Sequence, residues 1–293
     1  MTSTTQDDRR RPAGHGTGTS TSTSTTVHVN GLRLHVVERG TRGPALVFLH
    51  YWGGSARTWA QVVDALPADQ RCVLPDLRGW GASEAPPGDD AYALADLGAD
   101  IAALVGRLGL RRHVLVGHSM GGKVAQLLAA RRPPGLAGLV LVAPAPPGPL
   151  ALPPAAIEAM RTAYATRDGV EAAIDHMLTA RTLAPAVRAQ VIEDSLRGAP
   201  GAKSAWPTRT SREDIRAALD DIAVPVMVIA GTEDRVDSLA TLRTGLLPYL
   251  RDADLRVLEG VGHLSPLEAP DAVAGCIAAF VARLDAGTGA LSG

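Results

Sequence analysis

The chain has 293 residues, 46% of them apolar, and 29 basic against 30 acidic side chains give a formal net charge of −1. This length and apolar content allow a sizeable core in one large domain. The basic and acidic residues are balanced and scattered along the chain, which excludes a basic stripe that binds nucleic acid and a polybasic patch that binds a membrane. The two cysteines are too few for a disulfide framework, so we expect a cytoplasmic protein with reduced thiols.

The two ends of the chain differ from the middle in composition. Residues 1–26 are rich in Ser, Thr and Gly and lack an apolar stretch that could form the core of a signal peptide. We expect this segment to be a disordered tail and residues 285–293 to be a short flexible tail. No later segment is long and apolar enough to span a bilayer, because prolines in residues 144–154 interrupt the longest candidate.

From residue 27 onward, short apolar runs alternate with longer helical patterns. Residues 27–29 and 32–37 flank Asn30-Gly31, a dipeptide that favours a type I′ hairpin turn. An antiparallel hairpin followed by this alternation predicts an α/β fold with a mostly parallel, doubly wound sheet, whose active loops lie at the carboxyl ends of the strands. The predicted strands are 45–49, 72–74, 113–116, 139–142, 224–229 and 255–258, and the predicted helices are 59–66, 96–108, 123–131, 239–250 and 269–284.

Residues 144–216 break the alternation. They contain no convincing strand, begin with a proline cluster and then show helical periodicity. We therefore expect a helical cap inserted into an α/β core that is formed by residues 27–143 and 217–284, with its apolar faces over the sheet edge that carries the active loops. For Met160 and Trp206, inside this segment, core packing is a better interpretation than pocket lining.

The pentapeptide Gly117-His118-Ser119-Met120-Gly121 lies between a predicted strand and a predicted helix. In that context the G-x-S-x-G pattern predicts a nucleophile elbow, a sharp turn that presents the serine oxygen. A side chain on Gly117 or Gly121 would collide with the neighbouring strand or helix, and the helix start aims free N–H groups at whatever bonds to Ser119. The pattern indicates a serine hydrolase.

A serine nucleophile needs a base, and the base needs a carboxylate that holds its tautomer. Asp234 and His263 each follow a predicted strand, and the chain order Ser119, Asp234, His263 is the order of this elbow architecture. Glu233 should point away if Asp234 points inward, and Asp237 is better interpreted as a cap of the helix that starts near residue 239. We therefore predict a catalytic triad of Ser119, His263 and Asp234.

The developing oxyanion also needs hydrogen-bond donors. The first predicted donor is the backbone N–H of Met120, and the second is the N–H of Trp52 in the loop after the strand at 45–49, with the Trp52 ring forming a wall of the pocket. The alternative is that Trp52 packs between loops without donating.

Three further basic side chains near these motifs receive no catalytic role. We expect His50 and His118 to set loop geometry through hydrogen bonds, and Lys123 to lie near solvent at the start of its helix.

The segment from Asp76 to Ser83 is similar to the D-x-R-G-x-G-x-S turn of the α/β-hydrolase superfamily. With the elbow and the triad order, the chain resembles that superfamily over residues 27–284, and specifically its compact bacterial esterase and non-haem haloperoxidase-like branch. The resemblance implies a structural turn in which Asp76 pairs with Arg78 and Ser83 is no rival nucleophile.

The chain departs from its relatives in the loop of residues 50–55. Tyr51 stands where relatives usually have glycine, and the loop lacks the proline that peracid-forming relatives often carry, which favours water as the acyl acceptor. The epoxide hydrolases and haloalkane dehalogenases of the superfamily have aspartate in place of Ser119, so the resemblance argues against both activities.

The predicted function is hydrolysis of carboxylic esters of small to medium hydrophobic substrates through an acyl-enzyme intermediate. A small molecule is the only partner that we expect, the sequence specifies no oligomeric state, and the eight histidines form no metal motif, so neither a metal nor another cofactor is expected. The alternatives are a carbon–carbon bond hydrolase or lactonase with the same triad, a cofactor-free perhydrolase or haloperoxidase, and a non-catalytic receptor on the same fold.

Overall fold

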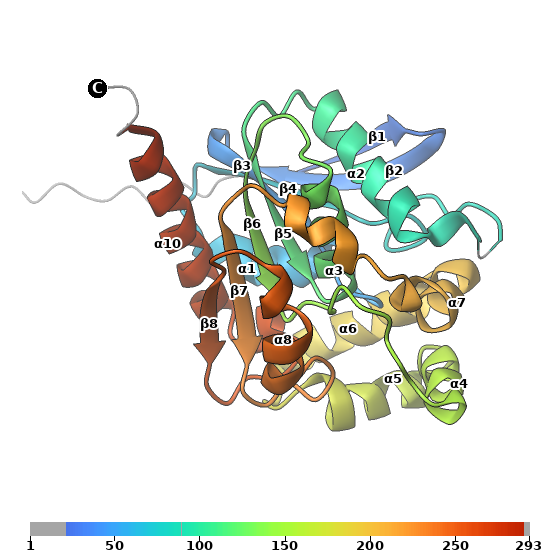
Figure 1. Ribbon diagram of the computed structural model, residues 1–293. Helices are drawn as coiled ribbons and strands as arrows, with labels where there is room; N and C mark the ends of the chain where they lie inside the picture. Colours follow the sequence, from blue (N-terminus) through green and yellow to red (C-terminus); the bar gives the residue numbers. More distant parts are fainter. Residues whose placement is uncertain (1–21, 89, 290–293) are drawn as a thin grey trace, which may run out of the picture.

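A computed structural model describes residues 22–88 and 90–289. Within them, eight strands form one sheet in the order β1-β2-β4-β3-β5-β6-β7-β8, antiparallel at β1, β2 and β4 and parallel from β4 to β8 (Figure 1). This confirms the predicted fold class. The strands are β1 (Thr23–Val29), β2 (Leu32–Arg39), β3 (Arg42–Leu49), β4 (Gln70–Pro75), β5 (His113–His118), β6 (Leu136–Val142), β7 (Val226–Gly231) and β8 (Asp254–Leu258).

The N-terminal hairpin turns at Asn30 and Gly31, whose φ angles of 47° and 77° confirm the predicted type I′ turn. Strand β1 begins at Thr23, which pairs with Glu38, so the predicted tail boundary at residue 26 is wrong by several residues. The polar composition suggested a tail, but threonine is β-branched and fits a strand when a partner strand supplies the hydrogen bonds. The rest of that predicted tail, residues 1–21, lies outside the described residues.

Both faces of the parallel sheet are covered by helices, because alternate residues of each strand point to opposite sides. Leu115 of β5 packs in the core beneath α2 (Leu94–Arg107) and α3 (Met120–Ala130). Its neighbours Val114 and Val116 pack in a second core beneath α1 (Ala60–Ala65) and α10 (Pro270–Gly289). The fully apolar strands in the sequence are explained by this burial on both faces.

Helix α10 continues to Gly289, so residues 285–289 are helical and the predicted start of the C-terminal tail is wrong. An ion pair between Arg112 Nη1 and Asp285 Oδ1, 2.5 Å apart, links its last turns to the loop before β5. The helix therefore continues beyond the point where its apolar pattern fades. Residues 290–293 lie outside the described residues.

The segment between β6 and β7 is helical. It contains α4 (Pro154–Ala163), α5 (Arg167–Ala173) with a π-helical turn at Ile174–Leu178, α6 (Pro185–Arg197) and α7 (Pro200–Thr208). A proline opens α4, α6 and α7, because its fixed φ suits the first helical turn and its missing N–H has no partner there. These helices group together beside the carboxyl ends of the parallel strands (Figure 1). We propose that they act as the expected cap.

The helix predicted over residues 239–250 is interrupted. Helix α8 covers Leu239–Gly245 and a short 3₁₀ turn follows at Leu247–Tyr249, because Pro248 lacks an N–H and its ring would clash inside a continuing helix. The remaining short elements are α9 (Ser265–Glu268) and 3₁₀ turns at Ala56–Trp59, Asp90–Tyr92, Thr210–Arg212 and Arg216–Asp221. Among the described residues, none of the helices combines the length and the hydropathy that crossing a bilayer requires.

The junction of β5 with α3 is packed backbone against backbone. A Cβ atom on Gly117 would lie 2.4 Å from the carbonyl oxygen of Gly121, and one on Gly121 would lie 2.5 Å from the carbonyl oxygen of Leu49. Real Cβ atoms do not approach backbone oxygen so closely, so a side chain at either position must push β3, β5 and α3 apart.

We expect Gly117→Ala to lower the free energy of unfolding by about 2–3 kcal/mol, the upper range for overpacking, since backbone cannot move aside as a side chain can. Urea unfolding of the purified variant measures this. The control is Gly98→Ala in α2, where a new Cβ meets nothing within 4 Å and should stabilise the helix by about 0.5–1 kcal/mol. Equal stability of the two variants would contradict the packing argument.

Candidate active site

Ser119 lies at the turn between β5 and α3 in a strained backbone conformation. Its φ of 51° and ψ of −114° fall in a region that residues with side chains rarely adopt, at a cost of about 1–3 kcal/mol. Its N–H donates to the Val142 carbonyl at 3.2 Å, and its carbonyl accepts from the N–H groups of Lys123 and Ala145, each at 3.1 Å. These bonds hold the conformation that the glycine-flanked motif predicted.

Three side chains from distant segments meet at this turn. The Ser119 Oγ lies 2.9 Å from Nε2 of His263, which follows β8, and the His263 Nδ1 lies 2.9 Å from Oδ2 of Asp234, which follows β7. A carboxylate accepts only, so Nδ1 carries the proton and donates to Asp234, and Nε2 is left to accept from the serine hydroxyl. The structure thus brings together the three residues that the sequence analysis grouped.

The carboxylate of Asp234 is held from its other side. Its Oδ1 accepts from the N–H groups of Val236 at 2.8 Å and Asp237 at 2.9 Å. Burial raises the pKa of this carboxyl, but His263 and the two N–H groups outweigh burial and hold the pKa below its ordinary value. Burial lowers the pKa of His263, and the adjacent Asp234 carboxylate outweighs it, so the net pKa is raised above 6.5.

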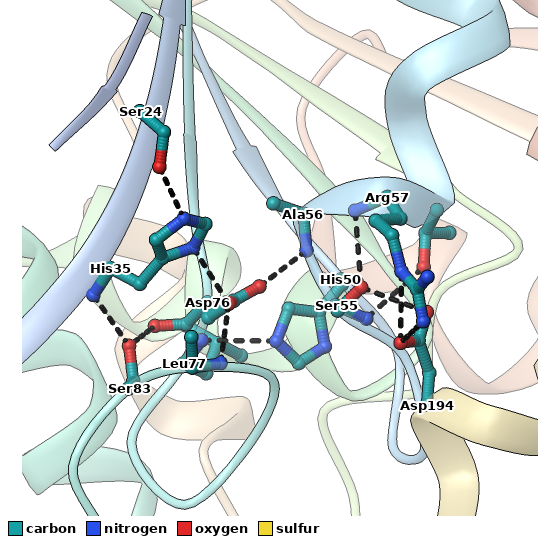
Figure 2. A network of polar contacts seen from close by, with 12 residues as sticks. Ser24, His35, His50, Ser55, Ala56, Arg57, Asp76, Leu77, Ser83 and Asp194 are labelled. Atoms are coloured by element: carbon teal, nitrogen blue, oxygen red, sulfur yellow. Dashed lines mark hydrogen bonds and ion pairs between the residues drawn. The ribbon is translucent and has the colours of Figure 1, made fainter. Parts of the chain in front are cut away.

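Two buried histidines support the loops around the site. His118 donates from Nε2 to the His263 carbonyl at 2.8 Å, and burial lowers its pKa to about 3. His50 accepts the Leu77 N–H at Nε2 and donates from Nδ1 to the Tyr51 carbonyl, which links the loop after β3 to the loop after β4 (Figure 2). Burial also lowers the pKa of His50, so both rings are neutral near pH 7.

Within the described residues, the backbone N–H groups of the two predicted oxyanion donors have no hydrogen-bond acceptor. Met120 is the first residue of α3, where a helix N–H has no partner within the helix. The Trp52 N–H donates no hydrogen bond within the part of the chain that the structure describes. The Trp52 ring stacks on Tyr164 of the inserted segment, with centroids 4.1 Å apart, and its role as a wall of the pocket stays a prediction.

The inserted helices hold the loop that carries Trp52. The Tyr164 hydroxyl donates to the Trp52 carbonyl at 3.2 Å, and the Ser195 hydroxyl donates to the Gly53 carbonyl at 3.1 Å. Asp194 of α6 accepts from the Ser55 hydroxyl at 2.8 Å and pairs with Arg57, as Figure 2 shows. The loop after β3 is therefore fixed by contacts with the insertion.

A cavity of about 580 Å³ opens onto Ser119 between the core and the inserted segment. Met160 and Trp206 pack in the core as expected, and both also lie in the wall of this cavity. Residues that pack in a core and residues that line a cavity have the same helical spacing, so the sequence does not distinguish the two roles. The placement of the inserted helices over the core does. The wall is mostly apolar, and its charged side chains are Arg216, Arg235 and Asp237.

The structure corrects two residue assignments near the site. Asp237 does not cap α8, because Ser238 does so by accepting the Thr241 N–H at 3.2 Å. Lys123 is not near solvent: its side chain is buried, with 1% exposed, and its Nζ donates to the carbonyls of Gly148 and Ser211, each at 2.9 Å. Burial lowers the pKa of this ammonium to about 8.

The turn after β4 differs from the expected pairing. Arg78 binds Asp100 of α2 through two bonds of 2.6 and 2.7 Å instead of Asp76. Asp76 is already engaged, because it accepts from the N–H groups of Ala56 and Ala82 and contacts His35 (Figure 2).

A second Ser-His-Asp arrangement joins the N-terminal hairpin to this turn. The Ser24 Oγ lies 2.7 Å from His35 Nε2, and His35 Nδ1 lies 2.8 Å from Asp76 Oδ2 (Figure 2). Ser24 belongs to the extended edge strand β1 and has neither the elbow conformation nor a helix start behind it. We interpret this set as a structural link and not as a reaction centre.

The chain is similar to known hydrolases. Over residues 46–275 the sequence matches the model of a family described as the alpha/beta hydrolase family. It is 36% identical over 114 residues to epoxide hydrolase 4 of Mus musculus and 39% identical over 123 residues to N-formylmaleamate deformylase of Pseudomonas putida. These alignments cover 39% and 42% of this chain and 32% and 46% of the relatives, so the chain spans less than half the length of either.

Among solved structures, an enol-lactonase from Burkholderia xenovorans is similar with a TM-score of 0.76 and 26% sequence identity, over 88% of this chain and 100% of that chain. Among the described residues, no group of three or more His, Cys, Asp or Glu side chains could hold a metal ion.

The two histidine rings in contact with each other should titrate far apart. We expect His118 to stay neutral down to a pKa of about 3, and His263 to gain its proton with a pKa above 6.5 because Asp234 stabilises the cation. NMR titration of isotope-labelled imidazole rings measures both values. A His118 ring that becomes charged between pH 5 and 8 would contradict its assignment as a buried neutral donor.

Proposed function

The chain belongs to the alpha/beta hydrolase family, and from that premise we propose that it is a serine hydrolase that cleaves carboxylic esters through an acyl-enzyme intermediate. The observation that carries the proposal is the unbroken set of hydrogen bonds from Ser119 through His263 to Asp234, at the edge of a cavity that reaches the serine. The strained elbow and the open N–H groups of Met120 and Trp52 support it.

Acylation follows from the positions of these groups. The Ser119 Oγ attacks the ester carbonyl carbon while His263 Nε2 takes the hydroxyl proton, and Asp234 stabilises the imidazolium that forms. The carbonyl oxygen becomes an oxyanion, which the N–H groups of Met120 and Trp52 stabilise. The tetrahedral intermediate then collapses, the carbon–oxygen bond to the alcohol breaks, and His263 gives its proton to the departing alkoxide.

Deacylation repeats these steps with water. His263 removes a proton from a water molecule that attacks the acyl carbon, a second oxyanion forms, and the Ser119 oxygen leaves with the proton from His263. Side chains, backbone N–H groups and water supply every group in this sequence. We further propose that the enzyme works in the cytoplasm, with Cys72 and Cys276 as free thiols.

The substrate class follows from the nucleophile and the cavity. A serine oxygen that opened an epoxide would form an ether, which this set of groups cannot hydrolyse, whereas an acyl ester can be hydrolysed. A volume of about 580 Å³ and a mostly apolar wall suit esters of small to medium hydrophobic acids. Lactones are a second candidate class, because the similar enol-lactonase spans nearly the same fold and a lactone is a cyclic ester.

We expect a fluorophosphonate probe to label the protein at Ser119 and Ser119→Ala to lower kcat on p-nitrophenyl esters by about 10⁴-fold or more, because the nucleophile is lost. Peptide mapping of the labelled protein and steady-state kinetics measure the two effects. The matched control is Ser24→Ala, which removes the serine of the other Ser-His-Asp arrangement and should keep both labelling and turnover. Labelling that persists in Ser119→Ala would remove the assignment of the nucleophile.

The pH dependence tests the roles of His263 and Asp234. Since His263 acts as a base only when neutral, kcat/KM should rise with pH through a pKa above 6.5. Asp234→Asn removes the carboxylate that raises this pKa, so the inflection should move to lower pH while kcat falls by about 10⁴-fold.

The control for that experiment is Glu233→Gln, which removes the neighbouring exposed carboxylate and should leave the profile in place. An inflection that moves in Glu233→Gln and stays in Asp234→Asn would exchange the roles of the two acids.

A further inference from the structure

The mechanism leaves one acid in the cavity without a role. Asp237 is only 4% exposed and belongs to the wall of the same cavity as Ser119. Within the residues that the structure describes, neither of its carboxyl oxygens accepts a hydrogen bond. The cavity wall therefore contains an acceptor that a bound molecule can satisfy.

The backbone of Asp237 is fixed relative to the reacting atoms. The Asp237 N–H donates to Asp234 Oδ1 at 2.9 Å, and the next residue, Ser238, caps α8. The backbone of Asp237 is thereby tied both to the triad acid and to a helix start. A substrate held at Ser119 therefore shares its cavity with a carboxyl group on an anchored backbone.

The charged groups around Asp237 decide what it can bind. Burial and the nearby Asp234 raise its pKa, while His263 and Lys123 lower it, and the result is a pKa of about 7. Because Arg216 and Arg235 lie in the same cavity wall, a cationic ligand would meet two like charges.

The two arginines are engaged elsewhere. Arg216 pairs with Asp214 at 2.5 Å, and Arg235 donates to the His176 carbonyl at 3.2 Å. Neither of them supplies the missing donor to Asp237. The hydrogen-bond donor that the Asp237 carboxyl group lacks is therefore best supplied by a neutral group of a bound molecule.

We propose that Asp237 is a specificity-determining residue that accepts a hydrogen bond from a hydroxyl group of the substrate, so that the preferred substrates are hydroxylated esters. This inference rests on the proposed esterase function. An ionised carboxylate can only accept, and a hydrogen bond to a charged acceptor is stronger than a neutral one. A site built around such a bond discriminates against an analogue that has a methyl group in place of the hydroxyl.

Matched ester pairs test the proposal. On the acyl side the pair is p-nitrophenyl 3-hydroxybutyrate and p-nitrophenyl 3-methylbutyrate, and on the alcohol side it is 3-hydroxypropyl butyrate and butyl butyrate. In at least one pair we expect kcat/KM to favour the hydroxylated ester by about 10-fold to 100-fold. The ratio within a pair cancels any effect of Asp237 on His263, because both esters use the same triad.

Variants assign the preference to this residue. Asp237→Leu should abolish the preference, and Asp237→Asn should keep part of it, because the amide oxygen still accepts. The control is Glu233→Gln, which removes a carboxylate of the same loop that is not in the cavity wall. This variant should keep the kcat/KM ratio of each ester pair at the value of the unmodified protein. The preference should also grow as the pH rises through about 7, the pKa of Asp237, a change that a purely structural role would not produce.

The possible failures are distinguishable. Ratios within about twofold of unity in both pairs, or a preference that survives in Asp237→Leu, would overturn the role of Asp237 while the esterase function stands. A protein that hydrolyses neither member of either pair, with Ser119 unlabelled by the fluorophosphonate, would instead overturn the proposed function.

Discussion

The strained backbone of Ser119 is the constraint on which the site depends. Its positive φ exists only because β5, α3 and β3 approach one another with no side chain at Gly117 or Gly121 between them. The strain is offset by the three backbone hydrogen bonds that Ser119 makes to its surroundings and by the packing of α3 on the sheet. As a result, the hydroxyl projects toward His263 at the start of a helix, where unpaired N–H groups gather.

The inserted helices have two connected effects on this site. They supply part of the cavity wall, including Met160 and Trp206, and through Tyr164 and Ser195 they bind two carbonyl groups of the loop that carries the Trp52 N–H. Changes in the insertion therefore reach the proposed oxyanion donor as well as the substrate. In the proposed mechanism, selectivity and the stabilisation of the oxyanion both depend on this segment. A tyrosine can stand at position 51 because its φ is not positive, so the loop does not need a glycine there.

Sequence reasoning succeeded where local pattern and chain order carry the information. Buried strands, the hairpin turn and the grouping of Ser119, Asp234 and His263 follow from periodicity, glycine placement and the ends of strands. It failed where the outcome depends on packing between distant segments, as in the pairing of Arg78 with Asp100 and the burial of Lys123.

The sequence predicts only a helix cap at Asp237, because no local signal distinguishes a carboxyl group in a cavity wall from one that caps a helix. A related conclusion follows from the hydrogen-bonded set of Ser24, His35 and Asp76. Residue types and hydrogen bonds alone do not define a reaction centre without the elbow, the helix start and the cavity.

The contacts of Lys123 have a consequence for how such proteins diversify. Its single ammonium group binds the chain just before α4, at Gly148, and just after α7, at Ser211, so both ends of the insertion are fastened to α3, the helix that follows the proposed nucleophile. Helices of other lengths can occupy the space between these two anchors and keep the same attachment to α3. They must also replace the contacts by which Tyr164 and Ser195 hold the loop that carries Trp52.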